Sequence, residues 1–381
     1  MTTTLRPSTT RAAISDIEQE VLSAALCRSA RLPDLEQHFD DNILSLADRR
    51  YRDLGLQELL IHAAQANGYE GRSLRGDLPT VLEAGFSTES LPGILSNVAN
   101  KFLLAGFQSV ESSWRAIAAI RNVPDFKPVT SYRLTGASQY AKVGPGGEIT
   151  HGTLGEEKYT NQADTYGRMI GISRQDIIND DLGALSTVPK KLGRGAALCL
   201  NEVFWSTFLD NAAFFTAMNG GLVSGTDTAL TVDGLTKAEV AFLERTDPEG
   251  KPLGIEPKLL LVPNNLSVPA SQLMHSLEIR DTGAGAAYPT ANPHTGKFQI
   301  VRSSYLAASS SQANADPRAW YLLADPQDLA VIEVAFLNGS VEPTIEQAQA
   351  DFSTLGIQMR GWHDFGVSMQ DARAAIKMAG K

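Results

Sequence analysis

The chain has 381 residues, with 33 lysines and arginines against 43 aspartates and glutamates, which gives a formal net charge of −10. A chain of this length exceeds one typical compact core, so we expect two or more lobes. Proteins that grip nucleic acid through its phosphates carry dense basic surfaces, and this sequence has no dense run of lysine and arginine. Specific nucleic-acid binding is therefore not expected.

Membrane association is not expected either. No apolar run in the sequence approaches the roughly 18 residues that are needed to span a bilayer. The N-terminal stretch also lacks the apolar segment of a secretory signal.

Residues 1–80 predict a helical N-terminal segment. Their first 13 residues are rich in threonine and lack an apolar period, which is typical of disorder. Apolar residues then recur at helical spacing around Ile17 and Val21 and again around Leu56 and Leu60. The polar stretch 71–80 contains glycine and predicts a linker. The segment is either separate from the main core or an extra layer packed on it.

A further helix is expected after this linker. Pro92 can open it, and an apolar stripe follows that includes Ile94, Val98 and Phe102. We expect this stripe, and Ile94 and Phe102 in particular, to contact another subunit.

Residues 126–135 and 158–173 predict two extended arms of a long hairpin, because both alternate with a period of two and are rich in Thr, Tyr, Val and Ile. The arms offer no two-sided apolar face, and an isolated two-stranded ribbon is marginal in water. We therefore expect the hairpin to lie against another copy of the chain. The expected contact residues of its tip and arms are Tyr140, Lys142, Gly144, Pro145, Gly146, Gly147, Glu148 and Lys158.

A long amphipathic helix is expected over residues 188–210, after the capping cluster at 179–181. Gly193 and Gly195 in this helix indicate close packing or a bend. The rest of the chain predicts a mixed lobe. Its elements are turns at 219–235, a helix at 235–245, a buried strand near 257–263, later strands up to residue 369 and a short final helix at 371–377.

No pattern in the sequence supports catalysis or metal binding. The six histidines do not cluster, and Cys27 and Cys199 are expected to be buried thiols. His363 and Asp364 resemble half of a catalytic triad, but no Gly-x-Ser-x-Gly elbow supplies the nucleophile. The glycine-rich stretch 282–289 lacks the Lys-Ser/Thr ending of a phosphate-binding loop. We expect no catalytic residue, no cofactor and no metal.

The order of these elements resembles the major capsid proteins of tailed bacteriophages with the Hong Kong 97 fold. Several phrases resemble the branch with prohead protease/capsid fusions, which is related to Mu-like major head subunits. The phrases are AALCRSARLPDLEQHFDD, LPGILSNVANKFLLAGF, TYGRMIGISRQDIINDDLGAL and LGRGAALCLNEVFW. The similarity runs from about Ala24 to the end of the chain, and nothing before residue 24 matches a protease.

The resemblance implies an α+β fold whose parts have family names. Residues 1–80 would be a helical segment, either scaffold-like and cleaved or retained as an extra layer, and 81–125 the N-arm. Residues 126–175 would be the E-loop hairpin, which lies over a neighbouring subunit. The P domain would comprise 176–219, with its long spine helix, and the strands of 336–381, while 220–335 would form the A domain. Some relatives cross-link covalently through an E-loop lysine, and Lys142 and Lys158 lie in that region.

The resemblance also implies the partners and the place of the protein. It would assemble with itself into pentamers and hexamers of an icosahedral shell, around double-stranded DNA that it does not bind specifically. Portal, head maturation protease and a decoration protein are the other expected partners. The protein would reside in the virion and assemble in the host cytoplasm. The alternatives are an encapsulin-like compartment shell and, as a different class, a hydrolase with an unrecognised triad.

Overall fold

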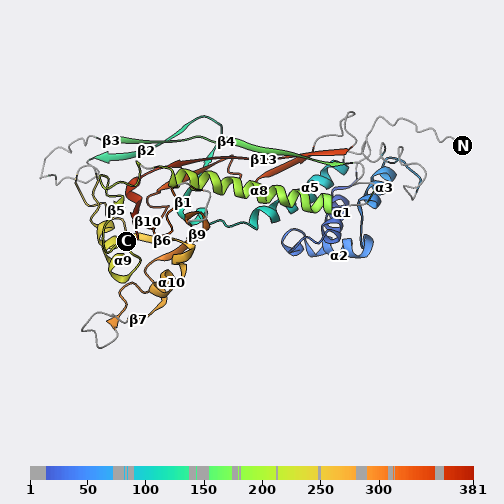
Figure 1. Cartoon of the computed structure of the whole chain (residues 1–381). Helices are drawn as coiled ribbons and strands as arrows, with labels where there is room; N and C mark the ends of the chain where they lie inside the picture. Colours follow the sequence, from blue (N-terminus) through green and yellow to red (C-terminus); the bar gives the residue numbers. More distant parts are fainter. Residues whose placement is uncertain are drawn as a thin grey trace. The chain divides into compact units, whose positions relative to one another are not determined.

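A computed structural model gives the fold of the chain (Figure 1). It describes residues 14–71, 81, 84, 90–136, 143, 154–173, 179, 182–211, 213–247, 250–279, 290–307, 312, 314–347 and 356–381.

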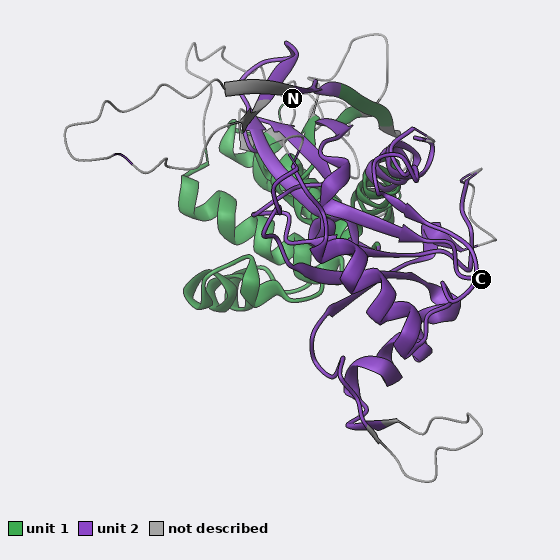
Figure 2. Ribbon diagram, turned by 90° about the vertical axis from the view of Figure 1, so that its left-hand side faces the viewer, with its two compact units in different colours: residues 1–110, 165–199, 341–363 green, residues 111–164, 200–340, 364–381 purple. Residues whose placement is uncertain are grey.

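The chain divides into two compact units, each assembled from three separated stretches (Figure 2). Unit 1 consists of Met1–Val110, Thr165–Cys199 and Val341–His363, and unit 2 of Glu111–Asp164, Leu200–Ser340 and Asp364–Lys381. The stretches expected to form the P domain, 176–219 and 336–381, contribute to both units. The long helix α8 (Leu182–Leu209) and the strand β13 (Gly356–Met369) each run through both.

Unit 1 is mainly helical. Its helices are α1 (Asp16–Ser29), α2 (Asp41–Arg50), α3 (Leu56–Ala66), α5 (Ser90–Gln108) and the first part of α8, with a short 3-10 turn, η1 (Leu35–Gln37), between α1 and α2. The strands β4 (Asp164–Ser173), β12 (Thr344–Gln347) and the first half of β13 complete it. Within this unit, β12 runs antiparallel to β13, and β4 pairs with β13 as well.

One hydrophobic core joins the N-terminal helices to α5. Leu22 and Leu26 of α1 and Leu59 of α3 are buried together with Ile94 and Phe102 of α5. The apolar stripe of α5 is thus covered by the chain's own helices, because α1 and α3 both pack on α5. The expectation that Ile94 and Phe102 contact another subunit needs correction, because they are 1% and 3% exposed and offer no free surface to a neighbour. Of the two alternatives for the N-terminal segment, residues 14–71 agree with the extra layer that packs on the core.

Two glycines allow α5 and α8 to cross at backbone contact. A Cβ atom on Gly193 of α8 would lie 1.8 Å from the carbonyl oxygen of Leu103, and one on Gly106 of α5 would lie 2.0 Å from the carbonyl oxygen of Lys190. The close packing expected at Gly193 is confirmed. Gly195, by contrast, has nothing within 4 Å of its Cβ position.

The helix α8 begins at Leu182, six residues before the expected start. Proline is favoured in the first turn of a helix, which made residue 188 a natural start. The structure instead accommodates Pro189 inside the helix. Proline there removes one backbone hydrogen bond, so the packing of α8 on α5 must outweigh that loss.

Unit 2 is built on a five-stranded mixed sheet in the order β5-β14-β10-β6-β9. The helix α9 (Val232–Leu243) packs against β14, β10 and β6, while α10 (Ser267–His275) packs against β6 and β9 (Figure 1). The strands are β5 (Leu222–Val223), β6 (Pro257–Pro263), β9 (Gln299–Ser303), β10 (Trp320–Ala324) and β14 (Ala375–Met378). The 3-10 turns η2 (Asn264–Leu266) and η3 (Ser304–Leu306) follow β6 and β9.

The short helix expected at 371–377 is wrong. Only the 3-10 turn η4 (Ala372–Ala374) forms there, and the next residues form β14 between β10 and β5. Ala375 and Ile376 are fully buried, so the sheet outweighs the helical propensity of the alanines.

A second group of strands completes unit 2. The short helix α6 (Trp114–Ile117) leads into β1 (Ala118–Val123), which runs parallel to β11 (Ile332–Leu337). β11 runs antiparallel to the second half of β13. The small hairpin of β7 (Glu278–Ile279) and β8 (Thr290–Ala291) and the ribbon of β2 and β3, described below, also belong to this unit. Within the described ranges, no helix combines the length and apolarity that crossing a bilayer requires.

Gly193→Ala is expected to destabilise the protein by about 1–3 kcal/mol or more, because the added methyl group meets a backbone carbonyl that cannot rotate away. Gly195→Ala is the matched control, and it should be neutral or stabilising by up to about 1 kcal/mol, since alanine is the better helix former. Urea unfolding of both variants measures the difference. Equal effects of the two substitutions would contradict the close helix crossing.

Candidate functional site

The most distinctive surface element is a two-stranded antiparallel ribbon. β2 (Val129–Gly136) and β3 (Leu154–Asn161) pair from Val129 opposite Asn161 to Gly136 opposite Leu154 (Figure 1). Among the described residues, neither strand pairs with a third strand. The hairpin that the sequence predicted is therefore present.

Its second arm is shorter than expected. The predicted run 158–173 is interrupted at residues 162–163, and β4 after the break pairs with β13 instead of β2. Two features turn the chain at this point. The side-chain oxygen of Asn161 accepts a hydrogen bond from the backbone of Gln162 (2.9 Å), and Ala163 is buried with Val123 and Ala335.

A buried polar network holds the root of the ribbon. The Asn161 side-chain amide donates to a carboxylate oxygen of Glu333 (3.1 Å), and the other oxygen lies 3.6 Å from the Arg121 guanidinium. Arg121 also donates to the hydroxyl of Ser131 on β2. Asn161 and Glu333 are 4% and 8% exposed, so their polar groups depend on one another rather than on water.

Contacts with the second half of β13 add to this root. The Ser368 hydroxyl donates to the backbone oxygen of Thr160 (2.7 Å). A Cβ atom on Gly366 would lie 1.8 Å from the carbonyl oxygen of Gln162, so only glycine fits there. The ribbon is thus anchored firmly at one end and, in the part of the chain that the structure describes, joins no sheet.

The sequence reasoning missed Arg121, Asn161 and Glu333. One signal was available, since Glu333 is a lone carboxylate in the apolar run that forms β11, and such a group needs a buried partner. Its partners lie far away in sequence, in β1 and at the end of β3, and no local pattern connects them.

The predicted contact residues fall into three groups. Lys158 lies on β3 opposite Tyr132, and its side chain is exposed. Ile94 and Phe102 are buried in unit 1. The remaining seven, all near the tip, lie outside the described residues: Tyr140, Lys142, Gly144, Pro145, Gly146, Gly147 and Glu148.

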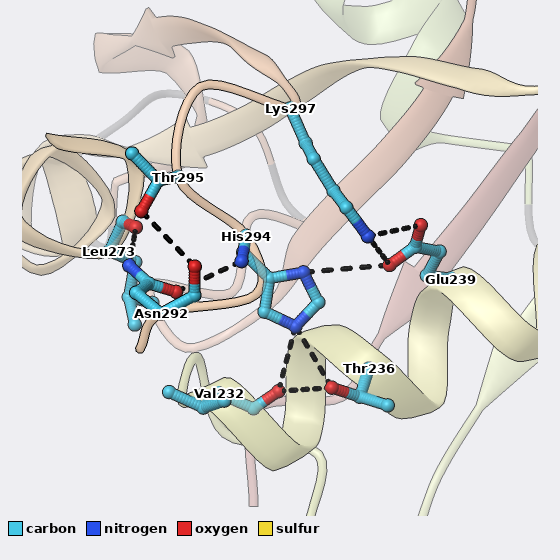
Figure 3. Close-up of polar contacts among 8 residues, drawn as sticks. All are labelled: Val232, Thr236, Glu239, Leu273, Asn292, His294, Thr295 and Lys297. Atoms are coloured by element: carbon cyan, nitrogen blue, oxygen red, sulfur yellow. Dashed lines mark hydrogen bonds and ion pairs between the residues drawn. The ribbon is translucent and has the colours of Figure 1, made fainter. Parts of the chain in front are cut away.

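A second polar cluster surrounds His294 in unit 2 (Figure 3). The Nε2 atom of His294 lies 2.9 Å from the Thr236 hydroxyl and 3.3 Å from the backbone oxygen of Val232, both on α9. Its Nδ1 atom lies 3.5 Å from the Glu239 carboxylate, to which Lys297 donates at 2.9 Å. His294 is 1% exposed, and burial lowers its pKa below the ordinary value although Glu239 acts in the opposite direction. This cluster fastens residues 292–297 to α9.

The polar contacts of both clusters join one element of unit 2 to another. His363 is buried in β13, with Nε2 3.1 Å from the backbone oxygen of Val341 and its ring packed edge-on against Phe107. Within the described ranges, no cluster of three or more histidine, cysteine, aspartate or glutamate side chains is arranged to hold a metal.

A protein-family model described as "Phage capsid protein" matches residues 156–378, which is more than half of the chain. The chain belongs to this phage capsid family. It is a structural major capsid protein rather than an enzyme, and its place is the virion. These predictions are confirmed, as is the α+β class of the fold, in which the helices of unit 1, the ribbon, the long helix, the mixed sheet and the returning strands follow one another in the expected order.

Several solved shell structures are similar to the capsid protein at low identity. The capsid of Cyanophage P-SCSP1u has a TM-score of 0.43 at 16% identity, over 69% of this chain and 86% of that chain. The capsid of Myoviridae Phage XM1 has a TM-score of 0.44 at 8% identity, over 70% and 91%. A virus-like particle from Pyrococcus furiosus has a TM-score of 0.41 at 9% identity, over 74% and 97%. The identification depends on the family match and not on these distant likenesses. No curated protein matches the chain in sequence.

Asn161→Ala is expected to loosen the ribbon root, because it leaves the Glu333 carboxylate without its amide donor. The loss of such a buried hydrogen bond costs about 1–3 kcal/mol. Hydrogen exchange should therefore become faster in β2 and β3 and stay unchanged in the sheet around β10. Asn264→Ala, at an exposed asparagine of the same unit, is the control and should leave the ribbon amides unaffected. Unchanged ribbon exchange in Asn161→Ala would show that the network does not anchor it.

The His294 cluster predicts that acid destabilises the protein. The pKa of His294 is lowered in the folded state from its ordinary value of 6.5. At lower pH the unfolded chain therefore binds the proton more readily than the folded protein, and the free energy of unfolding decreases as the pH falls. The free energy of unfolding should thus decline from about pH 7 to about pH 5 more steeply in the wild type than in His294→Gln. His275→Gln, at an exposed histidine of the same unit, should keep the wild-type slope. Parallel curves for His294→Gln and the wild type would rule out this role.

Proposed function

We propose that this capsid protein assembles into pentamers and hexamers of an icosahedral head shell that encloses double-stranded DNA. In this proposal the β2–β3 ribbon is the E-loop, which lies over a neighbouring subunit. Residues 220–335 act as the A domain, which meets its copies around the symmetry axes. The long helix and the strands of 336–381 act as the P domain.

The ribbon is the observation that carries this proposal. An isolated two-stranded ribbon is marginal in water, and strands that lack a third partner tend to pair with or pack on another chain. The ribbon root is nonetheless held by the buried Asn161–Glu333–Arg121 network. Within the described ranges one end of the ribbon is fixed and neither strand pairs with a third, which suits the ribbon to grip a neighbour.

Assembly from many weak contacts also agrees with the composition. Each contact of a ribbon contributes modestly, but several contacts per subunit add up through multivalency. The net charge of −10 opposes tight binding of the enclosed DNA. The DNA would therefore be contained rather than bound specifically. Portal, head maturation protease and a decoration protein are the further partners of this proposal, and assembly takes place in the host cytoplasm.

The N-terminal helices act as a permanent cover in this proposal. Residues 14–71 share one core with α5, and α1 and α2 pack together on it. Removal of these residues would expose the stripe that includes Ile94 and Phe102 to water. A scaffold that a protease cuts away would need a surface that separates more easily.

The test is electron microscopy of the purified chain, together with light scattering over a range of concentration and salt. Closed shells, pentamers or hexamers are expected. Monomers under all conditions would refute the proposal, and DNA-free particles filled with one foreign enzyme would favour a compartment shell.

A ribbon deletion sharpens the test. Ser131 and Tyr159 are opposite each other in the ribbon, so residues 132–158 can be replaced by an Asn-Gly turn that keeps the Asn161–Glu333 contact. This variant should fold with a stability within about 1 kcal/mol of the wild type, since the lost ribbon is marginal by itself. It should fail to form shells. A variant that unfolds would show that the ribbon belongs to the subunit's own core.

A further inference from the structure

A cavity of about 680 Å³ opens on unit 2 beside the root of the ribbon. Its walls come from residues 213–220, the end of α9 with residues 244–247, and residues 370–373, and Tyr159 of β3 contributes one side. All of these residues belong to unit 2. Neither the ribbon root network nor the His294 cluster includes them.

Two buried donors line this cavity without an acceptor. The guanidinium of Arg245, 7% exposed, donates to the backbone oxygens of Gly220 (2.6 Å), Ala375 (2.7 Å) and Ala372 (3.0 Å). Its Nε atom and the side-chain nitrogen of Gln370, which is 9% exposed, have no hydrogen-bond partner among the described residues. Buried donors in native proteins are normally paired, so these two call for acceptors from outside the chain.

The cavity also has an apolar side. Met218 is 100% exposed, and it lies with Phe214 and Ala241 in the cavity wall. A methionine is flexible and adapts to varied apolar partners, so its complete exposure at a cavity rim favours a partner that covers it.

The charges of the cavity restrict the chemistry of that partner. Asp371 is paired with Arg373 at 2.8 Å, and the charge of Arg245 faces three backbone oxygens. The acidic Glu244 and Asp247 add negative charge to the wall. Phosphates and carboxylates are therefore disfavoured, whereas neutral carbonyl oxygens match the two donors.

We propose that the cavity receives an extended peptide segment of a second copy of this capsid protein. Main-chain carbonyl oxygens of the segment accept hydrogen bonds from Gln370 and Arg245, and one of its apolar side chains covers Met218 and Phe214. A polypeptide supplies both groups together without negative charge. A second copy is favoured because Tyr159 makes the cavity continuous with the ribbon, the surface assigned to the neighbouring subunit. The inference rests on the proposed self-assembly.

Met218→Asp tests the proposal without disturbing the fold, because the side chain is fully exposed. It should raise the protein concentration needed for assembly at least about tenfold while the thermal unfolding curve stays unchanged, since about 1.4 kcal/mol of lost contact corresponds to a factor of ten. Gln370→Glu, which replaces the donor by a carboxylate, should act in the same direction. Ile17→Asp is the matched control, because Ile17 is 67% exposed on α1, lies outside the cavity and belongs to no surface assigned to a neighbouring subunit.

Assembly of Met218→Asp at the wild-type concentration overturns the inference, and so does an equal defect in Ile17→Asp. If the wild-type protein itself never assembles, the proposed self-assembly is wrong. If the wild type and Met218→Asp assemble equally well, self-assembly stands and only the proposal about the cavity is wrong.

A photo-crosslinking amino acid in place of Met218 identifies the occupant. Shells assembled from a mixture of ¹⁴N and ¹⁵N subunits should give crosslinked peptides that combine the two labels, both from this chain. Crosslinks that stay within one label, or that attach only to another protein, overturn the proposal.

Discussion

The close crossing of α5 and α8 is the constraint on which unit 1 depends. Gly193 and Gly106 each bring one helix against a backbone carbonyl of the other, at distances that no Cβ atom tolerates. The close contact between the two helices sets the position of the apolar stripe of α5. The helices α1 and α3 and the strand β12 pack against α5. The packing of α8 on α5 also explains why α8 contains Pro189, because tertiary packing, and not helix propensity, determines the length of this helix.

Unit 2 holds the β2–β3 ribbon, an element that pairs with no third strand in the part of the chain that the structure describes. Three polar side chains from β1, β3 and β11 form the anchor, and Gly366 of β13 closes against the residue after β3. Arg121 is partly exposed, so its ion pair with Glu333 gains little net stability, but loss of a partner of the buried Glu333 carboxylate is costly. Its value here is geometric, since it fixes the point from which the ribbon leaves the subunit.

Patterns among neighbouring residues in the sequence predicted the elements that depend on neighbouring residues alone. The period of two revealed β2 and β3, the helical period revealed α5 and α8, and Gly193 revealed close packing. Long-range pairing was not visible. Nothing near Asp164 indicates that β4 turns to β13, nothing in DARAAIK indicates that it completes a sheet, and nothing in the stripe of α5 indicates which helices cover it. In each case the deciding partner is another element of the fold: β13 for β4, β10 and β5 for the DARAAIK stretch, and α1 and α3 for α5.

The discontinuous make-up of the two units has a consequence for synthesis. Asn161 leaves the ribosome 172 residues ahead of Glu333, its partner at the ribbon root. At about 5–20 residues per second this interval is roughly 10–30 s, during which the ribbon has no anchor. Neither unit can close before its last stretch, 341–363 or 364–381, has emerged. During synthesis the ribbon therefore precedes its Glu333 partner, and the chain carries it before either unit has closed.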